Sequence, residues 1–174
     1  MSIIIYSILG FLGFVLLFGT FFIVRQQSAA VVERFGKFVS VRHSGLQIKI
    51  PIIDRVSGRV SLRVQQLDVV VETKTKDDVF VKIKVSVQYK VIKDKVFDAF
   101  YKLDFPQDQI TSYVFDVVRA EVPKMILDDV FEKKDDVAIA VKSELNDSML
   151  NYGFDIIKTL VTDIDPDAQV KDSM

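Results

Sequence analysis

The chain has 174 residues, of which 49% are hydrophobic, with no cysteine, one histidine and a formal net charge of −1. This composition excludes a Cys-His or paired-histidine metal site. The sequence contains no GxxxxGK[ST] or GxGxxG run and no GxSxG elbow, so a glycine-loop phosphate site and a serine hydrolase elbow are also excluded.

An uncharged apolar run from Ile3 to Val24 opens the chain and ends before Arg25. A helix of this length covers roughly 33 Å, enough to cross a hydrocarbon core about 30 Å thick. A cleaved signal peptide fits poorly, because a basic leader is missing and the run exceeds the usual apolar region. We predict a retained transmembrane anchor over residues 1–25, with anchor residues Ile3, Leu9, Phe14, Leu17, Phe22 and Val24.

Charge is distributed unevenly after this run. Residues 25–63 hold eight Lys and Arg against two acidic residues, giving +6, and residues 64–174 hold 15 against 22, giving −7. The positive-inside rule therefore predicts a single-pass membrane protein whose domain lies in the cytoplasm. A periplasmic or extracytoplasmic position stays open, because so short a leader can insert either way.

The first predicted strands lie close to the apolar run. Ala29 to Phe35 reads as a strand that Gly36 interrupts, and Leu46 to Ile52 alternates apolar and polar residues. The apolar side chains of this second strand either face the domain core or enter the lipid headgroup region. The second alternative predicts a membrane-surface contact formed by Arg34, Lys37, Arg42, Leu46, Ile48, Ile50 and Ile52.

A long antiparallel hairpin is predicted next. Every odd residue from Val79 to Val91 is apolar, whereas the even positions from Lys82 to Lys90 are polar, so one face is buried and the other is wet. The stretch from Val60 to Thr75 supplies the partner strand, and residues 76–78 form the turn. At least one more strand is required, because an isolated hairpin is only marginally stable.

Helical spacing follows the hairpin. Asp94 is predicted to cap a short helix, and a second helix runs from Pro106 until Pro123 ends it. Asp128 or Asp129 is expected to cap a single turn.

The last elements are a longer helix and a strand. Asp136 is predicted to cap a helix that Gly153 closes, and a strand runs from Ile156 to Ile164. Residues 167–174 then resemble the start of a further helix.

No residues form a recognisable catalytic or ligand site. His43 is interpreted as a solvated turn residue, and the paired aspartates fall where turns and caps are expected. The spacing of Asp163, Asp165 and Asp167 begins like a calcium loop, but Ala168 replaces the required glycine. We therefore predict no enzyme activity, no cofactor, no metal and no nucleic-acid partner.

Three long segments resemble a known family: RVQQLDVVVETKTKDDVFV at 63–81, YVFDVVRAEVPKMILDDVFEKKDDVA at 113–138 and YGFDIIKTLVTDIDPDAQVK at 152–171. They are similar to the SPFH (band 7) domain of stomatin, prohibitin and flotillin relatives. The similarity is greatest to the hypersensitive-induced response proteins, followed by bacterial stomatin-like proteins.

This resemblance implies an α+β domain over residues 26–174, with a membrane-proximal β lobe at about 26–75 and an α/β lobe at about 76–166. Residues 167–174 would begin a truncated coiled-coil helix. The resemblance also implies a non-enzymatic membrane scaffold that assembles into homo-oligomeric rings or cages and organises lipid microdomains and membrane-protein complexes. A regulatory module that binds a membrane AAA protease or channel is the alternative. Since the missing helix would supply much of the contact, we expect weak self-association of this chain in detergent.

Overall fold

The computed structural model describes residues 4, 6–7, 10, 14 and 19–166. Of the predicted anchor residues, Ile3, Leu9 and Leu17 lie outside this description, as does the predicted helix start at 167–174. Phe14 is helical and exposed. Within the described part of the chain, no helix is both long and apolar enough to cross a membrane.

The end of the predicted anchor is a strand. Phe21–Val24 forms β1, which pairs antiparallel with β4 (Gly45–Ile48) in a two-stranded ribbon. The anchor prediction is therefore wrong for Phe22 and Val24. An apolar run of aromatic and β-branched residues suits a strand as well as a helix, and here β4 supplies the hydrogen-bonding partner.

The chain divides into two compact units, an N-terminal unit (Met1–Arg63) and a C-terminal unit (Val64–Met174). Beside the ribbon, the N-terminal unit holds a three-stranded antiparallel sheet with β2 at its centre. Its strands are β2 (Ser28–Arg34), β3 (Lys37–Arg42) and β5 (Asp54–Ser61). The predicted break at Gly36 is confirmed as the turn between β2 and β3.

The predicted hairpin is confirmed in the C-terminal unit. A three-stranded antiparallel sheet has the order β6-β7-β8, formed by β6 (Gln65–Lys74), β7 (Phe80–Val91) and β8 (Phe154–Pro166). Val60, expected in the first hairpin strand, belongs to β5 instead. The units divide after Arg63, earlier than the predicted lobe boundary near residue 75, because β6 pairs with β7 over its full length.

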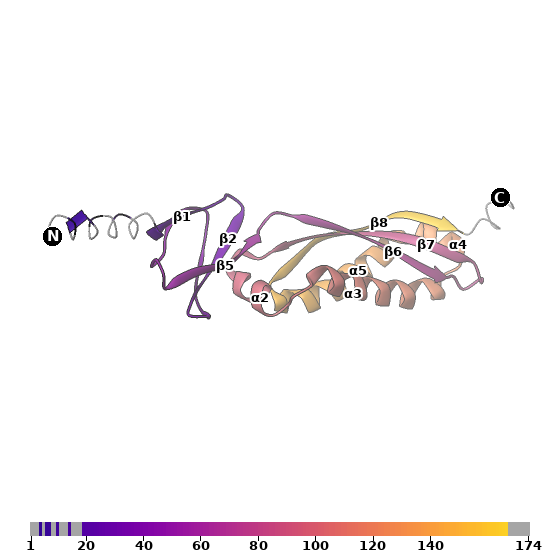
Figure 1. The fold of residues 1–174 in the computed structure, drawn as a ribbon. Coiled ribbons are helices and arrows are strands. Elements are labelled where there is room, and N and C mark those ends of the chain that lie inside the picture. Colours follow the sequence, from indigo (N-terminus) through magenta and orange to yellow (C-terminus); the bar gives the residue numbers. More distant parts are fainter. Residues whose placement is uncertain (1–3, 5, 8–9, 11–13, 15–18, 167–174) are drawn as a thin grey trace. The chain divides into compact units, whose positions relative to one another are not determined.

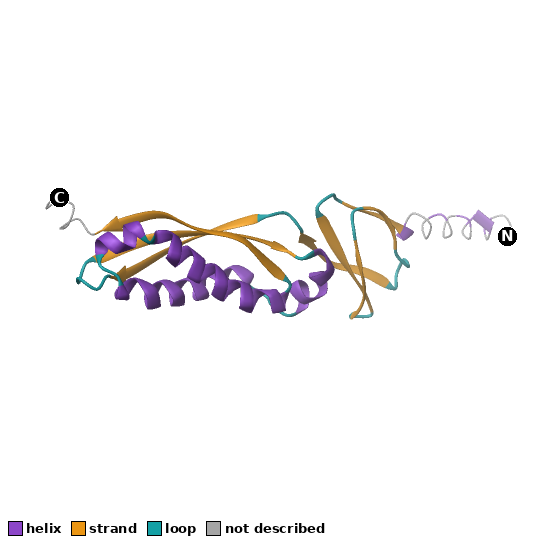
Figure 2. Ribbon diagram, turned by 180° about the vertical axis from the view of Figure 1, so that it is seen from behind, coloured by secondary structure: helices purple, strands orange, loops and turns teal. Residues whose placement is uncertain are grey.

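Two long helices cover one face of this sheet, as Figures 1 and 2 show. They are α3 (Pro106–Glu121) and α5 (Lys134–Met149). The shorter helices are α2 (Val96–Tyr101) and α4 (Leu127–Glu132), with 3₁₀ turns η1 (Lys93–Lys95), η2 (Val122–Lys124) and η3 (Leu150–Tyr152). The domain is therefore α+β, as predicted.

The core of the C-terminal unit lies between β7 and the two long helices. The odd residues from Val81 to Val91 are all buried, as predicted. Ile110 of α3 and Leu145 of α5 are completely buried. The opposite, solvent-facing side of β7 differs from the prediction at one position, because Ser86 is buried within a polar network.

The predicted caps at Asp94, Asp128, Asp129 and Asp136 are wrong, because no side chain caps any of these helices from its own N-cap position. Helix α4 is capped from a distance instead. Oδ1 of Asp77, in the turn between β6 and β7, accepts a hydrogen bond of 3.1 Å from the Leu127 N–H. This bond satisfies one of the free N–H groups of the first helical turn. The predicted closure at Gly153 is confirmed, with a φ of +84°.

Strand β8 is an outer strand of its sheet and carries two bulges, one of which lies in its middle. The register with β7 shifts between Gln88 and Tyr89, which leaves Ile157 as the extra residue. Nζ of Lys142, from α5, donates a hydrogen bond of 3.0 Å to the Ile157 carbonyl. A lysine side chain therefore occupies a backbone acceptor in the middle of this strand.

Candidate functional site

One face of the β1–β4 ribbon consists of large apolar side chains. The register pairs Phe21 with Ile48 and Ile23 with Leu46, and alternate residues of a strand share a face. All four side chains are exposed to solvent, whereas Val24 on the opposite face is buried. We call Phe21, Ile23, Leu46 and Ile48 the apolar face.

Two more apolar side chains project from one end of the three-stranded sheet. Phe35, in the β2–β3 turn, is 86% exposed, and Ile52, in the loop before β5, is 92% exposed. Arg34 pairs with Asp54 in the register of β2 and β5, so this turn and this loop lie at the same end. Phe35 and Ile52 have φ angles of +49° and +73°, which are unfavourable for residues other than glycine. Backbone strain that holds an apolar side chain in solvent is typical of a functional contact.

An ion pair fixes the loop that displays Ile52. Nε of Arg34 donates to Oδ1 of Asp54 at 2.8 Å, and the Ile50 N–H donates to Oδ2 of Asp54 at 2.9 Å. The Asp54 N–H donates in return to the Ile50 carbonyl at 2.9 Å. The hydrogen bond from Arg34, followed by that from the Ile50 N–H, lowers the pKa of Asp54. The carboxylate is thus held ionised, and it joins the loop to the sheet.

The predicted apolar contact residues lie together in the N-terminal unit. Leu46 and Ile48 belong to the apolar face, and Ile50 and Ile52 belong to the loop that follows. All four are exposed, so the alternative in which they pack into the core is wrong. Strand β4 ends at Ile48, which is earlier than the predicted end at Ile52.

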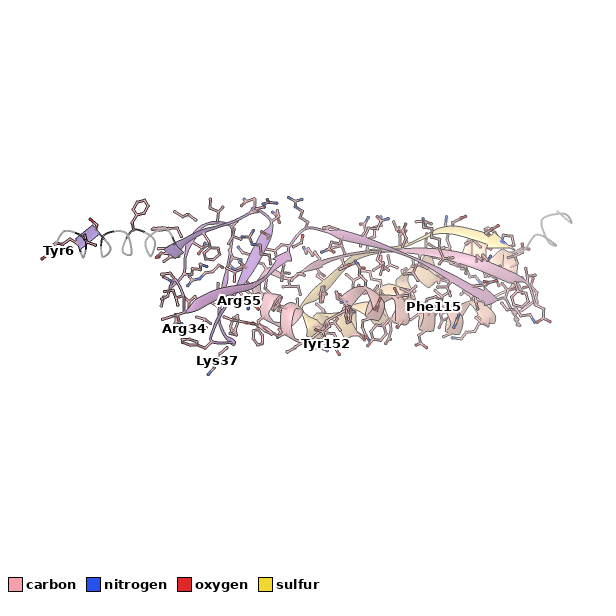
Figure 3. The ribbon with its side chains drawn as sticks, in the orientation of Figure 1. Tyr6, Arg34, Lys37, Arg55, Phe115 and Tyr152 are labelled. Carbon is pink, nitrogen blue, oxygen red and sulfur yellow. The ribbon has the colours of Figure 1, made fainter. Side chains whose placement is uncertain are left out.

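The predicted basic contact residues are divided between two places. Arg34 and Lys37 flank the turn that carries Phe35, as Figure 3 shows. The Arg34 side chain is 42% exposed and is already committed to Asp54. Arg42 is half-buried at the other end of β3. The structure therefore brings Arg34 and Lys37 together with the exposed loop but separates Arg42 from them.

Three residues of this surface were not predicted. Phe21 and Ile23 were hidden in the apolar run assigned to the anchor, and Phe35 was assigned to a strand. The one available signal was Gly36, because a glycine that follows a strand tolerates a positive φ and so predicts a tight turn with an exposed tip. No local sequence pattern indicated that β1 pairs with β4.

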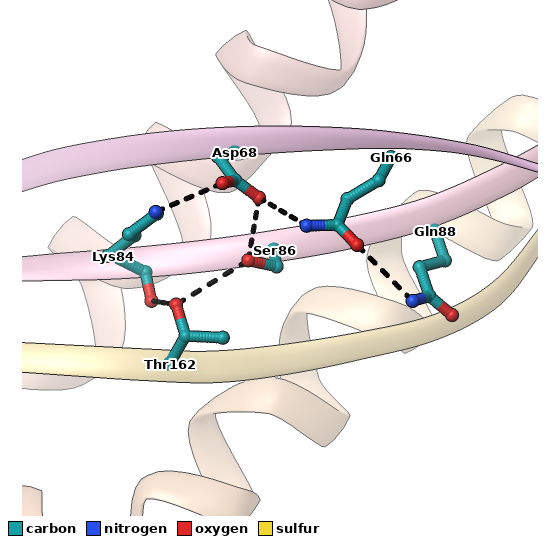
Figure 4. Close-up of polar contacts among 6 residues, drawn as sticks. All are labelled: Gln66, Asp68, Lys84, Ser86, Gln88 and Thr162. Atoms are coloured by element: carbon teal, nitrogen blue, oxygen red, sulfur yellow. Dashed lines mark hydrogen bonds and ion pairs between the residues drawn. The ribbon is translucent and has the colours of Figure 1, made fainter.

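A polar network lies on the open face of the sheet in the C-terminal unit (Figure 4). Asp68 accepts hydrogen bonds from Ser86 Oγ at 2.7 Å and Gln66 Nε2 at 2.9 Å, and Lys84 Nζ lies 3.0 Å away. The hydroxyl of Thr162 lies 3.4 Å from that of Ser86. The network spans all three strands beside a second register shift of β7 and β8, between Lys84 and Val85, which leaves Thr162 as the extra residue.

This network does not resemble a nucleophile with its base. The hydrogen bonds from Ser86, Gln66 and Lys84 lower the pKa of Asp68 from 3.8 to about 2, so its carboxylate is a weak base near neutral pH. Ser86 is buried, and His43 belongs to the other unit. Among the described residues, no group of three His, Asp or Glu side chains is placed to hold a metal ion.

We expect the network to stabilise the fold in a pH-dependent way. Because the folded pKa of Asp68 lies below 3.8, its contribution is fully present above that pH and is lost as the pH falls towards about 2. Replacing Asp68 with asparagine should therefore lower the urea midpoint near neutral pH, and the difference from wild type should shrink over this acid range. Urea titrations at several pH values measure this effect.

The exposed Asp116 on α3 provides a matched control, because it has the same charge and belongs to the same unit. Replacing Asp116 with asparagine should change the urea midpoint little at any pH. A pH-independent loss for Asp68→Asn would show that the ionised carboxylate contributes nothing beyond packing.

Comparison with known proteins agrees with this architecture. Residues 22–174 match the model of the SPFH domain / Band 7 family. The chain is 46% identical over 152 residues to hypersensitive-induced response protein 4 of Arabidopsis thaliana, and 31% identical over 152 residues to mitochondrial stomatin-like protein 2 of Homo sapiens. These matches cover 87% of this chain but 52% and 42% of the two relatives, so the chain spans about half of their length or less. Stomatin-like protein stl-1 of Caenorhabditis elegans is 28% identical over 155 residues. With a family model matched from residue 22 to the end of the chain and a two-unit α+β fold, this protein belongs to the SPFH domain / Band 7 family.

Proposed function

We propose that this protein is a non-enzymatic membrane scaffold whose N-terminal unit contacts the lipid surface. The observation that carries the proposal is the apolar face, together with Phe35 and Ile52, all exposed in a unit of charge +6 between residues 25 and 63. Moving a large aliphatic or aromatic side chain out of water gains roughly 1.5–3 kcal/mol. Basic residues beside an anionic leaflet add about 1 kcal/mol each where they reach it.

The apolar residues from Ile3 onward serve in this proposal as a single-pass anchor ahead of β1. Helical Gly19 and Thr20 lead directly into β1, and the Lys49 N–H donates to the Thr20 carbonyl at 2.8 Å. A membrane segment ending there would bring the adjoining loop to the bilayer. The positive-inside rule then places the C-terminal unit in the cytoplasm.

Neighbouring copies pack laterally in this proposal into rings or cages that organise lipids and other membrane proteins. Membership of a family whose proteins are generally membrane scaffolds supports it. The alternative, a regulatory module for a membrane protease or channel, would use the same lipid contact but would require a dominant foreign partner.

The lipid contact can be tested with the full chain in proteoliposomes, because the protein has no cysteine of its own. An environment-sensitive fluorophore is attached to Ile52→Cys or, as a control, to Ser143→Cys, an exposed position on the outer side of α5. Brominated lipids should quench the probe at position 52 and leave the probe at position 143 unaffected. Equal quenching at both positions, or none at position 52, would refute the contact.

The same proteoliposomes distinguish the scaffold from the binding module. Lysine cross-linking of the protein in these vesicles should yield a ladder of self-adducts. Cross-linking in native membranes that instead yields one stoichiometric foreign adduct and no self-adducts would favour the module.

A further inference from the structure

Two arginines lie opposite each other across the central strand of the N-terminal unit. Ala30 of β2 pairs with Arg42 on β3 and with Arg59 on β5. Directly opposed residues share a face of a sheet, and two strand spacings place the arginine Cα atoms roughly 10 Å apart. Only the methyl group of Ala30 separates them, so both guanidinium groups can reach one small ligand.

Hydrogen-bonding capacity is left unused beside these arginines. Among the described residues, the buried side-chain polar atoms without a hydrogen-bond partner are Ser40 Oγ, Arg42 Nε, His43 Nδ1 and Thr159 Oγ1. Three of these four atoms belong to residues 40–43. Ser40 pairs with Val32 two residues along β2 from Ala30, so it lies on the same face as Arg42. Buried polar atoms are nearly always paired, so the two unpaired atoms that share this face, Ser40 Oγ and Arg42 Nε, are suited to hold a bound partner.

The positive charge of residues 25–63 also exceeds their negative charge. Residues 25–63 contain two carboxylates, those of Glu33 and Asp54. Asp54 already accepts hydrogen bonds from Arg34 and also attracts Arg42 electrostatically, and Glu33 lies opposite Arg55 in the register. Water could satisfy the unpaired atoms of Ser40 and Arg42, but it would leave the excess positive charge in place. An anion satisfies both.

We infer that Ser40, Arg42 and Arg59 form a binding site for a phosphate group. A guanidinium presents a planar fork of N–H donors that matches phosphate oxygens, and a serine hydroxyl supplies a further donor. Nη2 of Arg59 also donates to the carbonyl of Ile23 at 3.5 Å, so the site adjoins the apolar face. This position suits a phosphate carried by a lipid, in which case the inference rests on the proposed membrane contact. Free phosphate shares the same chemistry.

The test uses the full chain in phosphatidylcholine nanodiscs and follows thermal unfolding. One arm adds inorganic phosphate against chloride at equal ionic strength, and the other adds phosphatidic acid to the lipid. At least one of these probes should raise the unfolding temperature of wild type. Replacing both Arg42 and Arg59 with glutamine should weaken the response at least about a hundredfold in ligand concentration, since two charge-assisted contacts are lost. The arm that responds identifies the source of the phosphate.

The matched control replaces Arg25 and Arg63 with glutamine, because both are exposed in the same unit and lie outside the site. This pair should respond like wild type. An equal loss in both pairs would show diffuse electrostatic attraction, and no response of wild type to either probe would show that the unpaired atoms bind only water. Either result overturns the inference.

Ser40→Ala provides a second test in case the double variant does not fold, because it changes no charge and removes one oxygen. It should weaken the response about tenfold. If Ser40→Ala responds like wild type while the folded double variant does not respond, Ser40 does not contact the phosphate, and the inference is wrong for that residue. Quenching of the Ile52 probe does not depend on this site, so failure here and failure of the lipid contact are distinguishable.

Discussion

Gly153→Ala is expected to destabilise the C-terminal unit by about 3 kcal/mol or more, since a left-handed alanine costs roughly 1–2 kcal/mol before any clash is added. The φ of Gly153 is +84°. A Cβ there would lie 2.5 Å from the Lys95 carbonyl oxygen and 3.2 Å from the Ala99 backbone nitrogen. Both are backbone atoms, and the Ile92 N–H donates to the Gly153 carbonyl at 2.9 Å, so the clash cannot be relieved by a rotamer change. Urea unfolding followed by circular dichroism measures the loss.

Gly36→Ala is the matched control for this substitution. The φ of Gly36 is similar, +79°, but nothing lies within 4 Å of the position that a Cβ would take. The expected cost is therefore the backbone term alone, about 1–2 kcal/mol. Equal losses at the two positions would show that the close approach to Lys95 contributes nothing.

The second large effect is expected in the core. Leu145 of α5 is completely buried, and truncating a buried leucine to alanine costs about 2–5 kcal/mol through lost burial and the cavity left behind. Leu145→Ala should shift the urea midpoint of the C-terminal unit strongly.

Ile139 lies on the outer side of the same helix and provides the control. It is 66% exposed, so Ile139→Ala should change the unfolding free energy by no more than about 0.5 kcal/mol. A loss at Ile139 similar to that at Leu145 would mean that the outer face of α5 is covered, which would contradict the burial described above.

Alternation along β7 was enough to predict its buried face. The period of two specifies which residues share a face, and α3 and α5 supplied the expected cover. The same periodicity from Leu46 to Ile52 gave two alternatives, because a pattern does not reveal what covers a face. The structure resolved them only by showing that these side chains are exposed and that no described residue covers them.

Partners that are distant in the sequence explain the other differences between the predicted and the observed structure. Asp77 caps α4 from 50 residues away, and Arg34 binds Asp54 across 20 residues. No local window contains both members of either pair. For the same reason Arg34 was predicted as a lipid contact although its main partner is a carboxylate. The Ser40–Arg42–Arg59 group depends on strand register, which the sequence alone did not reveal.

The bulge at Ile157 and the lysine bound to its carbonyl bear on whether two copies could pair through the edge of this sheet. An outer strand with free backbone groups is a template for pairing with another chain, and crowding increases that risk. In the middle of β8, Lys142 occupies the acceptor and the bulge breaks the regular spacing. Backbone pairing between copies is therefore disfavoured at this point, and crowded copies can approach this edge through side chains without merging their sheets into a continuous aggregate.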